Sequence, residues 1–176
     1  GFDLGVSWYG DAGQYLELVY FDQTVTDEIF FDLDTFSGYL QGSGDTESTG
    51  VELIGELQLF DSVVLNANYT YNDTEDSSGL QRLRRPEHLA NLGFTWQGMG
   101  DRLQLGMNVR GSYDSIAASG AKLDDYEVVD INASFEILKG LELYGRVENL
   151  LDEDYEEVLT YNTSGTAGYV GVRYSF

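Results

Sequence analysis

The chain has 176 residues, with 31 acidic and 9 basic side chains, and its formal net charge at pH 7 is −22. Such a surface repels phosphate groups and the sequence has no long Lys/Arg-rich run, so nucleic-acid binding is excluded. The absence of cysteine excludes a disulfide framework, a Cys-ligated metal and a thiol nucleophile. Because 42% of the residues are hydrophobic, we expect an ordered chain with a large buried or lipid-facing surface.

A membrane-spanning helix is not expected. The longest uninterrupted apolar run extends from Leu18 to Phe21, far short of the roughly 18 residues that a helical span needs. The sequence opens without Met or a signal segment, inside a predicted strand at Phe2. We therefore expect the chain to be a piece of a longer protein.

Apolar side chains recur at every second position, which is the period of a β-strand with two different faces. In the segment 63–72, Val63, Leu65, Ala67, Tyr69 and Tyr71 share one face, and the other carries mostly Asn and Thr. A helix would not produce this alternation. The same pattern occurs in seven further segments, at residues 2–8, 51–59, 90–96, 103–109, 129–137, 141–147 and 170–176.

The connections between these segments alternate in length. Short turns are predicted at Gly10–Gly13, Asp61–Ser62, Gln97–Asp101 and Lys139–Gly140. Long polar loops are predicted at Asp22–Gly50, with extended hairpin arms around Phe30 and Tyr39, and at Asp73–Arg85, Asp114–Asp125 and Asp152–Ala167. About nine antiparallel strands result, near the roughly 9 to 11 residues of a tilted bilayer-crossing strand. Short turns at one end and long loops at the other are typical of an outer-membrane barrel.

The distribution of charge between the two faces supports this interpretation, because a Lys or Arg facing lipid at mid-depth costs about 2 to 4 kcal/mol. The apolar positions of the eight segments contain no charged residue. The opposite face carries Glu52, Glu56, Arg110, Asp130, Glu136, Glu142, Arg146, Glu148 and Arg173. Tyr69, Tyr71, Trp96, Tyr113 and Tyr174 lie near strand ends, where amphipathic rings suit the headgroup region. The alternative is a soluble antiparallel sandwich, whose strands also alternate.

Two C-terminal runs, Tyr144–Tyr155 and Gly168–Phe176, resemble the C-terminal signature of TonB-dependent outer-membrane receptors. The runs Thr49–Glu52 and Arg84–His88 also match patterns common in the barrel of that family. The likeness covers essentially the whole chain. The sequence departs from the family pattern at Leu151, Ser164 and Thr166, which affects the expected shape of the last outer loop and not the fold.

The resemblance implies an all-β fold, a transmembrane antiparallel up-and-down β-barrel of 22 strands around an N-terminal plug. Residues 1–176 would be its C-terminal part, the fourteenth to twenty-second strands, with plug and earlier strands lying upstream. It also implies a bacterial outer-membrane receptor that takes up a scarce ligand with energy relayed by the TonB system.

Two sets of side chains are candidates for roles in such a barrel. By resemblance, the alternating residues that end in an aromatic would be the signal read by the outer-membrane assembly machinery; they are Val170, Val172, Tyr174 and Phe176. Charges on the inner wall could bind the plug; these candidates are Arg110, Glu142, Arg146, Glu148 and Arg173. Alternatively, the wall charges only solvate the lumen and pair across strands.

Acidic clusters occur in two of the long loops, at Asp73, Glu75 and Asp76, and at residues 152–157. They could bind calcium or bridge to lipopolysaccharide through divalent ions, but their spacing fits no ordered calcium loop and a solvated, self-repelling loop is favoured. We expect no metal site and no cofactor.

The single histidine, His88, shares a face with Ala90, Leu92 and other lipid-facing positions. It is interpreted as a residue of the membrane rim. An enzyme is not expected, because no base, acid and nucleophile are predicted to converge there.

The predicted function is TonB-energised uptake, in contact with lipid and lipopolysaccharide. The run Tyr155–Val158 and the loop Tyr161–Gly165 resemble the cobalamin-receptor branch most closely, so cobalamin ranks first as ligand and a ferric siderophore second. A passive porin or structural barrel without a plug is the alternative from another class. A third possibility is a small closed barrel in which the first and last strands pair.

Overall fold

A computed structural model of the chain describes residues 1–11, 13–32 and 35–176. These residues form eleven strands, in the order β1 (Phe2–Tyr9), β2 (Tyr15–Thr26), β3 (Ile29–Phe31), β4 (Tyr39–Gln41), β5 (Asp45–Phe60), β6 (Val63–Glu75), β7 (His88–Gly98), β8 (Leu103–Tyr113), β9 (Tyr126–Leu138), β10 (Leu141–Glu148) and β11 (Ala167–Tyr174). No helix in the described part of the chain has the length and hydrophobicity needed to cross a membrane.

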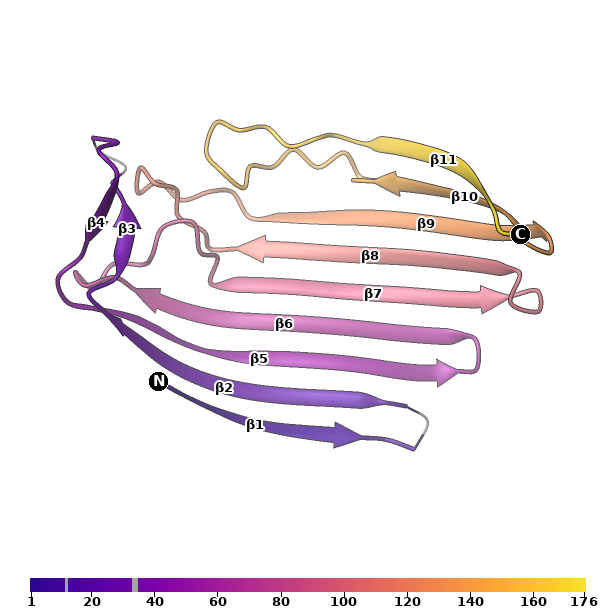
Figure 1. Cartoon of the computed structure of the whole chain (residues 1–176), viewed down its shortest axis with the longest axis horizontal. Helices are drawn as coiled ribbons and strands as arrows, with labels where there is room; N and C mark the ends of the chain where they lie inside the picture. Colours follow the sequence, from indigo (N-terminus) through magenta and orange to yellow (C-terminus); the bar gives the residue numbers. More distant parts are fainter. Residues whose placement is uncertain (12, 33–34) are drawn as a thin grey trace.

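Nine of these strands form one antiparallel sheet, in the order β1-β2-β5-β6-β7-β8-β9-β10-β11. Figure 1 shows them side by side in chain order, with β1 and β11 at opposite edges. The described strands β1 and β11 do not pair with each other, so the small closed barrel is ruled out. In the described residues no second sheet covers the apolar face of the main sheet, so the soluble sandwich is also wrong.

Apart from register shifts beside the β5–β6 and β9–β10 turns, the strand register keeps the predicted apolar positions on one face of the sheet, because directly opposed residues in antiparallel strands share a face. One row crosses seven strands through Trp8, Leu16, Gly55, Ala67, Leu92, Val109 and Val129. A second row continues through Leu105, Ala133, Gly145 and Val170. This apolar face is exposed to its surroundings, as the exposures of 70% for Leu4 and 80% for Val170 show.

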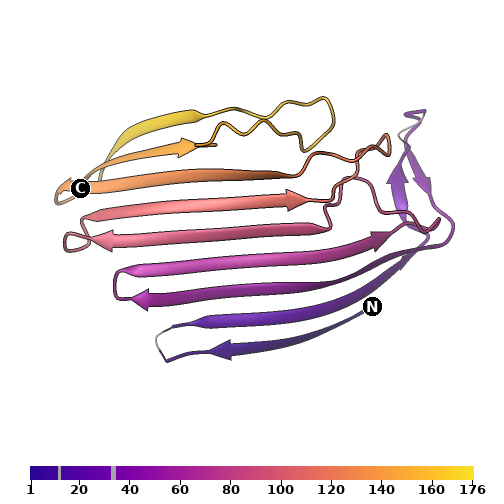
Figure 2. The ribbon, with the colours of Figure 1, turned by 180° about the vertical axis from the view of Figure 1, so that it is seen from behind.

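The connections differ at the two ends of the sheet (Figures 1 and 2). Short turns join β5 to β6 at Asp61–Ser62 and β9 to β10 at Lys139–Gly140, as predicted. The predicted turn Gly10–Gly13 separates β1 from β2, but its residue Ala12 lies outside the described residues. The long loops all lie at the other end, which we call the loop end of the sheet.

The predicted loop boundaries were wrong at several strands of the loop end. The first long loop was predicted for Asp22–Gly50, but β2 continues to Thr26 and β5 already begins at Asp45. Within this loop, residues 33 and 34 lie outside the described residues. In the same way, β6 runs on to Glu75, past the predicted loop start at Asp73. The last loop begins earlier than predicted, at Asn149, since β10 ends at Glu148.

The hairpin arms predicted around Phe30 and Tyr39 are present as β3 and β4, which pair as a separate two-stranded sheet. In both ribbon views this hairpin stands across the loop end, at a steep angle to the strands of the main sheet. Backbone hydrogen bonds from Asp27 to Gly44 (3.0 Å) and from Gly42 to Glu28 (2.8 Å) close its base.

Steric crowding in this sheet explains the glycine of the family-like run Thr49–Glu52. Gly50 on β5 is buried, and a Cβ atom there would lie 2.1 Å from the carbonyl oxygen of Tyr71 and 2.5 Å from the ring of Phe21. The aromatic ring therefore covers the backbone at a position where any side chain would clash.

Candidate functional site

The polar face of the sheet carries the charged residues that the sequence placed there. Arg146 of β10 forms a salt bridge with Glu148 (3.0 Å) and lies over the ring of Tyr169 (4.6 Å to the centroid). Arg173 of β11 pairs with Glu142 (3.4 Å). Such exposed pairs contribute little to stability, typically about 0 to 1 kcal/mol. Both arginines thus have partners within the sheet, and contact of these charges with a plug stays a prediction.

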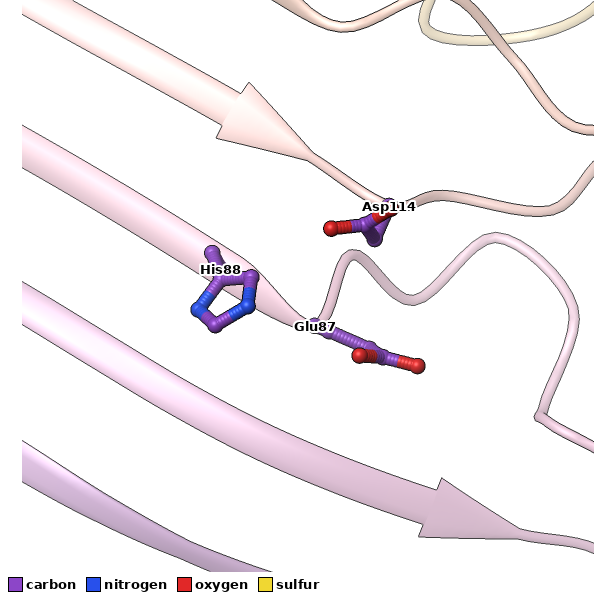
Figure 3. Close-up of side chains that lie close together, drawn as sticks. All are labelled: Glu87, His88 and Asp114. Carbon is purple, nitrogen blue, oxygen red and sulfur yellow. The ribbon is translucent and has the colours of Figure 1, made fainter.

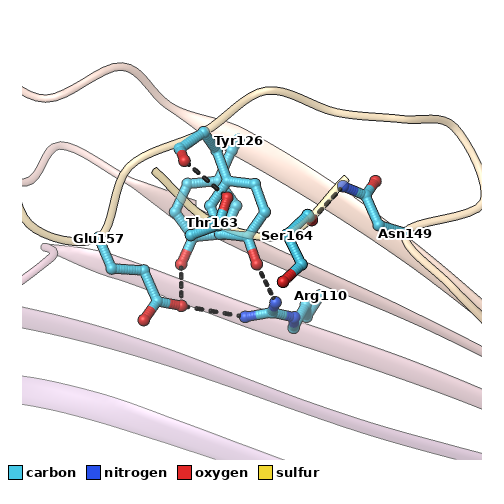
Figure 4. A network of polar contacts seen from close by, with 7 residues as sticks. Arg110, Tyr126, Asn149, Glu157, Thr163 and Ser164 are labelled. Carbon is cyan, nitrogen blue, oxygen red and sulfur yellow. Dashed lines mark hydrogen bonds and ion pairs between the residues drawn. The ribbon is translucent and has the colours of Figure 1, made fainter. Parts of the chain in front are cut away.

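Arg110 of β8 instead binds the long loop that follows β10. Its guanidinium donates hydrogen bonds to the hydroxyl of Tyr155 (2.5 Å) and to the carboxylate of Glu157 (3.2 Å). Tyr126 of β9 stacks against Tyr155, with ring centroids 4.3 Å apart, and donates to Glu157 (3.3 Å). Figure 4 shows this group of side chains on the inner surface of the loop. The last loop is therefore folded back onto the polar face of the sheet.

Asn149, at the start of this loop, organises its backbone. It is 4% exposed and adopts a left-handed conformation (φ 48°) that Asn tolerates better than most residues. Its side-chain amide donates to the carbonyls of Glu153 (2.8 Å) and Ser164 (3.2 Å), and its side-chain oxygen accepts from the N–H of Glu153 (2.8 Å). Asn149 thereby joins the two ends of the loop, which gives a physical reason for the family-like run Tyr144–Tyr155.

A hollow of about 550 Å³ lies between the β3–β4 hairpin and the neighbouring loops. Glu28 at the base of the hairpin accepts hydrogen bonds from Arg82 and from Thr46 (3.1 Å), so the hairpin is tied to the loop that follows β6. The lining also includes Phe30, Phe31 and Arg84. Its volume lies in the range of small-molecule sites, and it combines aromatic rings with guanidinium groups.

Nothing in the sequence predicts this hollow. Glu28 and Arg82 are 54 residues apart and belong to no common motif. The sequence matches a barrel pattern only at Arg84–His88, which does not include Arg82, and nothing in that run indicates which loop it meets.

His88 begins β7 and lies on the apolar face, opposite Tyr71 and Tyr113. Its ring nitrogen Nδ1 lies 2.7 Å from the hydroxyl of Tyr69. His88 therefore lies among aromatic side chains on the apolar face, and its place at the membrane rim stays a prediction. The structure also brings Glu87 and Asp114 to it (Figure 3), which the sequence did not predict. In the loop after β8, a hydrogen bond from Lys122 (2.7 Å) lowers the pKa of the Asp114 carboxyl below its usual value.

Three carboxylates of the predicted acidic clusters accept hydrogen bonds within their own loops. Asp76 accepts backbone hydrogen bonds from Ser78 (2.8 Å) and Leu80 (3.1 Å). Asp152 accepts from Thr166 (2.9 Å), and Glu156 accepts from Thr160 (2.9 Å). These contacts cap turns, and calcium binding by the clusters stays untested.

The C-terminal row lies where the sequence placed it. Val170, Val172 and Tyr174 are on β11 and are well exposed on the apolar face, and Phe176 follows the strand. The geometry agrees with lipid-facing residues, and a role in assembly stays a prediction.

Residues 1–150 match the protein family described as TonB dependent receptor-like, beta-barrel. The chain belongs to this family of TonB-dependent receptors. The expected fold class is confirmed, and membership places this sheet in the outer membrane of a Gram-negative bacterium. The apolar face therefore meets lipid, and the loop end faces the outside. The family consists of transport receptors and not of enzymes.

Among curated proteins, this TonB-dependent receptor chain is similar to two vitamin B12 transporters named BtuB. It is 35% identical to that of Photobacterium profundum over 114 residues, which cover 63% of this chain and 18% of the relative. It is 25% identical to that of Vibrio cholerae over 183 residues, 97% of this chain and 29% of the relative. The chain thus spans less than a third of either relative. An iron-regulated outer membrane virulence protein of Vibrio cholerae is 30% identical over 62% of this chain and 18% of its own length.

Solved structures show the same fold. The ferripyoverdine receptor of Pseudomonas aeruginosa superimposes with a TM-score of 0.82 at 18% identity, covering 99% of this chain and 26% of the receptor. The copper transporter OprC gives a TM-score of 0.81 at 22% identity, over 99% of this chain and 30% of that protein. At these identities the likeness concerns the sheet alone.

The replacement of Asn149 by Ala is expected to release the last loop. It removes three hydrogen bonds at about 1 kcal/mol each, so about 3 kcal/mol of local stability is lost. The measurement is limited digestion of the intact receptor with a Glu-specific protease, which has targets at Glu153, Glu156 and Glu157. Asn162→Ala, an exposed change in the same loop, is the control. Equal cleavage rates in the two variants would contradict the role of Asn149.

Proposed function

We propose that the chain is the C-terminal part of the barrel of an outer-membrane receptor that takes up cobalamin with energy from the TonB system. Residues 1–176 would supply the fourteenth to twenty-second of 22 strands, with plug and TonB-contacting segment upstream. Cobalamin ranks first as the ligand because 97% of the chain aligns with a vitamin B12 transporter. A ferric siderophore ranks second, supported by the likeness to the iron-regulated protein. A passive porin is not favoured, since the curated relatives are receptors and transporters.

The hollow beside the β3–β4 hairpin is the best candidate in this chain for ligand contact. It lies at the loop end, which faces the outside, and Phe30 and Phe31 present aromatic surface there. Arg82 and Arg84 could bind a negatively charged group of a ligand.

Ligand binding to the intact receptor tests the proposal directly. We expect saturable binding of cyanocobalamin in detergent, and uptake in cells that is abolished when the TonB system is deleted. Ferripyoverdine and ferric enterobactin serve as siderophore probes. Binding of a siderophore instead of cobalamin would favour the second candidate, and uptake that survives without TonB would favour a passive channel.

The paired arginines of the polar wall are proposed to border the plug. Replacing Arg146 and Arg173 together by Gln should loosen the plug, because two hydrogen-bonding cations are removed from the wall. We expect increased leak of small dyes through receptor in liposomes. Lys139→Gln, in the turn between β9 and β10, is the control for lost positive charge. A leak rate equal to that of the control would exclude contact with the plug.

The alternating C-terminal row Val170, Val172, Tyr174 and Phe176 is proposed as the signal for the outer-membrane assembly machinery. Deletion of Phe176 should lower the amount of folded receptor in the outer membrane, measured as the heat-modifiable band on gels. Phe60→Ala is the control, because Phe60 is an exposed aromatic at the same end of the sheet. Equal amounts of folded receptor in both variants would mean that Phe176 is only one of the lipid-facing residues.

A further inference from the structure

We propose that Glu87, His88 and Asp114 bind a divalent transition-metal ion at the loop end of β7 and β8. Each residue offers one ligand atom, and these three atoms lie within 4.8 Å of one another. In the described part of the chain this is the one cluster of three such ligands. Figure 3 shows where the three residues lie, with His88 on β7, Glu87 just before it and Asp114 just after β8.

The backbone holds the two carboxylate residues side by side. The N–H of Glu87 donates to the carbonyl of Asp114 (3.3 Å), and the carbonyl of Glu87 accepts from Asn72 (2.8 Å). The N–H of Asp114 donates to the carboxylate of Asp125 (2.8 Å). Because three contacts fix this backbone, binding of an ion requires only rotation of the side chains.

The imidazole is oriented by two aromatic neighbours. Its ring is stacked with Tyr69 (centroids 6.0 Å apart, 21° between planes) and lies 5.1 Å from the ring of Tyr71. The hydroxyl of Tyr69 is hydrogen-bonded to Nδ1 of His88 at 2.7 Å. The other ring nitrogen, Nε2, is therefore the one that can bind an ion. A hydrogen bond to the second ring nitrogen is the usual way in which proteins orient a histidine ligand.

The charge balance favours a cation at this point. Among the described residues, Glu87 has no salt bridge. Asp114 is paired with Lys122 at 2.7 Å, and the same ammonium lies 3.9 Å from Asp125. One lysine therefore serves two carboxylates, Asp114 and Asp125, and forms no salt bridge with Glu87. A bound metal would take the place of Lys122 at Asp114.

The donor set indicates the class of metal. One imidazole nitrogen with two carboxylate oxygens suits zinc and related transition metals, whereas calcium takes oxygen ligands only. Around a tetrahedral zinc ion with bonds near 2.1 Å, the donor atoms lie roughly 3.4 Å apart. The three donors must therefore approach by a small rotation, and water would complete the shell. Such an ion would fasten the loop before β7 to the loop after β8.

Zinc titration of the intact receptor tests this site, whatever nutrient the receptor transports. The receptor is stripped with a chelator and titrated with zinc chloride by calorimetry. We expect the unaltered receptor to bind one zinc ion. In His88→Gln and in Asp114→Asn, the affinity of this site for zinc should fall at least tenfold. Asp61→Asn, in a turn at the opposite end of the strands, is the matched control and should bind zinc as before.

Two further variants separate metal binding from a failure to fold. Lys122→Gln should bind zinc more tightly, because the competing ammonium is removed from an exposed loop. Tyr69→Phe should weaken binding by about tenfold or more, since it removes only the hydrogen bond that orients His88. Unchanged zinc affinity in His88→Gln and Asp114→Asn would overturn the proposal. Weaker zinc binding in Lys122→Gln would also overturn it. So would calcium binding that displaces zinc and is unchanged in His88→Gln.

Discussion

The constraint on which this structure depends is the absence of water in the hydrocarbon layer. Every backbone N–H and C=O that crosses it must be paired with another strand, and every outward side chain must be apolar. Between neighbouring strands of this sheet, one register meets both requirements, whereas the outer edges of β1 and β11 have no partner strand among the described residues. The rows that pass through Ala67 and Leu92, and through Ala133 and Gly145, join the apolar positions of successive strands without a break. A slip of β5 or of β10 by one residue would turn Glu52 or Arg146 toward lipid.

The same constraint confines charged and hydrogen-bonding side chains to the polar face of the sheet and to the loop end. Arg110 and Asn149 illustrate the result, because both use the polar side of the sheet to hold a long loop. Arg110 does so with a guanidinium that contacts Tyr155 and Glu157, and Asn149 with backbone contacts to Glu153 and Ser164. The last outer loop of this sheet is thus held in an ordered conformation by specific side-chain hydrogen bonds.

The alternation of apolar residues predicted eight strands of the sheet and their faces, and the predicted turns and loops between them added the strand β2 and the hairpin around Phe30 and Tyr39. It failed at the loop end, where β2 and β6 continue past Asp22 and Asp73. Beyond the bilayer a strand no longer needs apolar residues on one face, so the pattern stops although the hydrogen bonding continues. Contacts between loops were beyond prediction for another reason. The pairing of strands brings Glu28 close to Arg82 and His88 close to Asp114. No local spacing in the sequence connects these residues.

The comparisons bear on where ligand specificity resides. A ferripyoverdine receptor and a copper transporter share nearly the whole sheet with this chain, at TM-scores of 0.82 and 0.81. Proteins with such different cargo cannot be distinguished by the sheet, so the strands record ancestry better than ligand. In this chain the β3–β4 hairpin, joined to the loop after β6 by the ion pair between Glu28 and Arg82, borders the aromatic hollow that we propose for ligand contact.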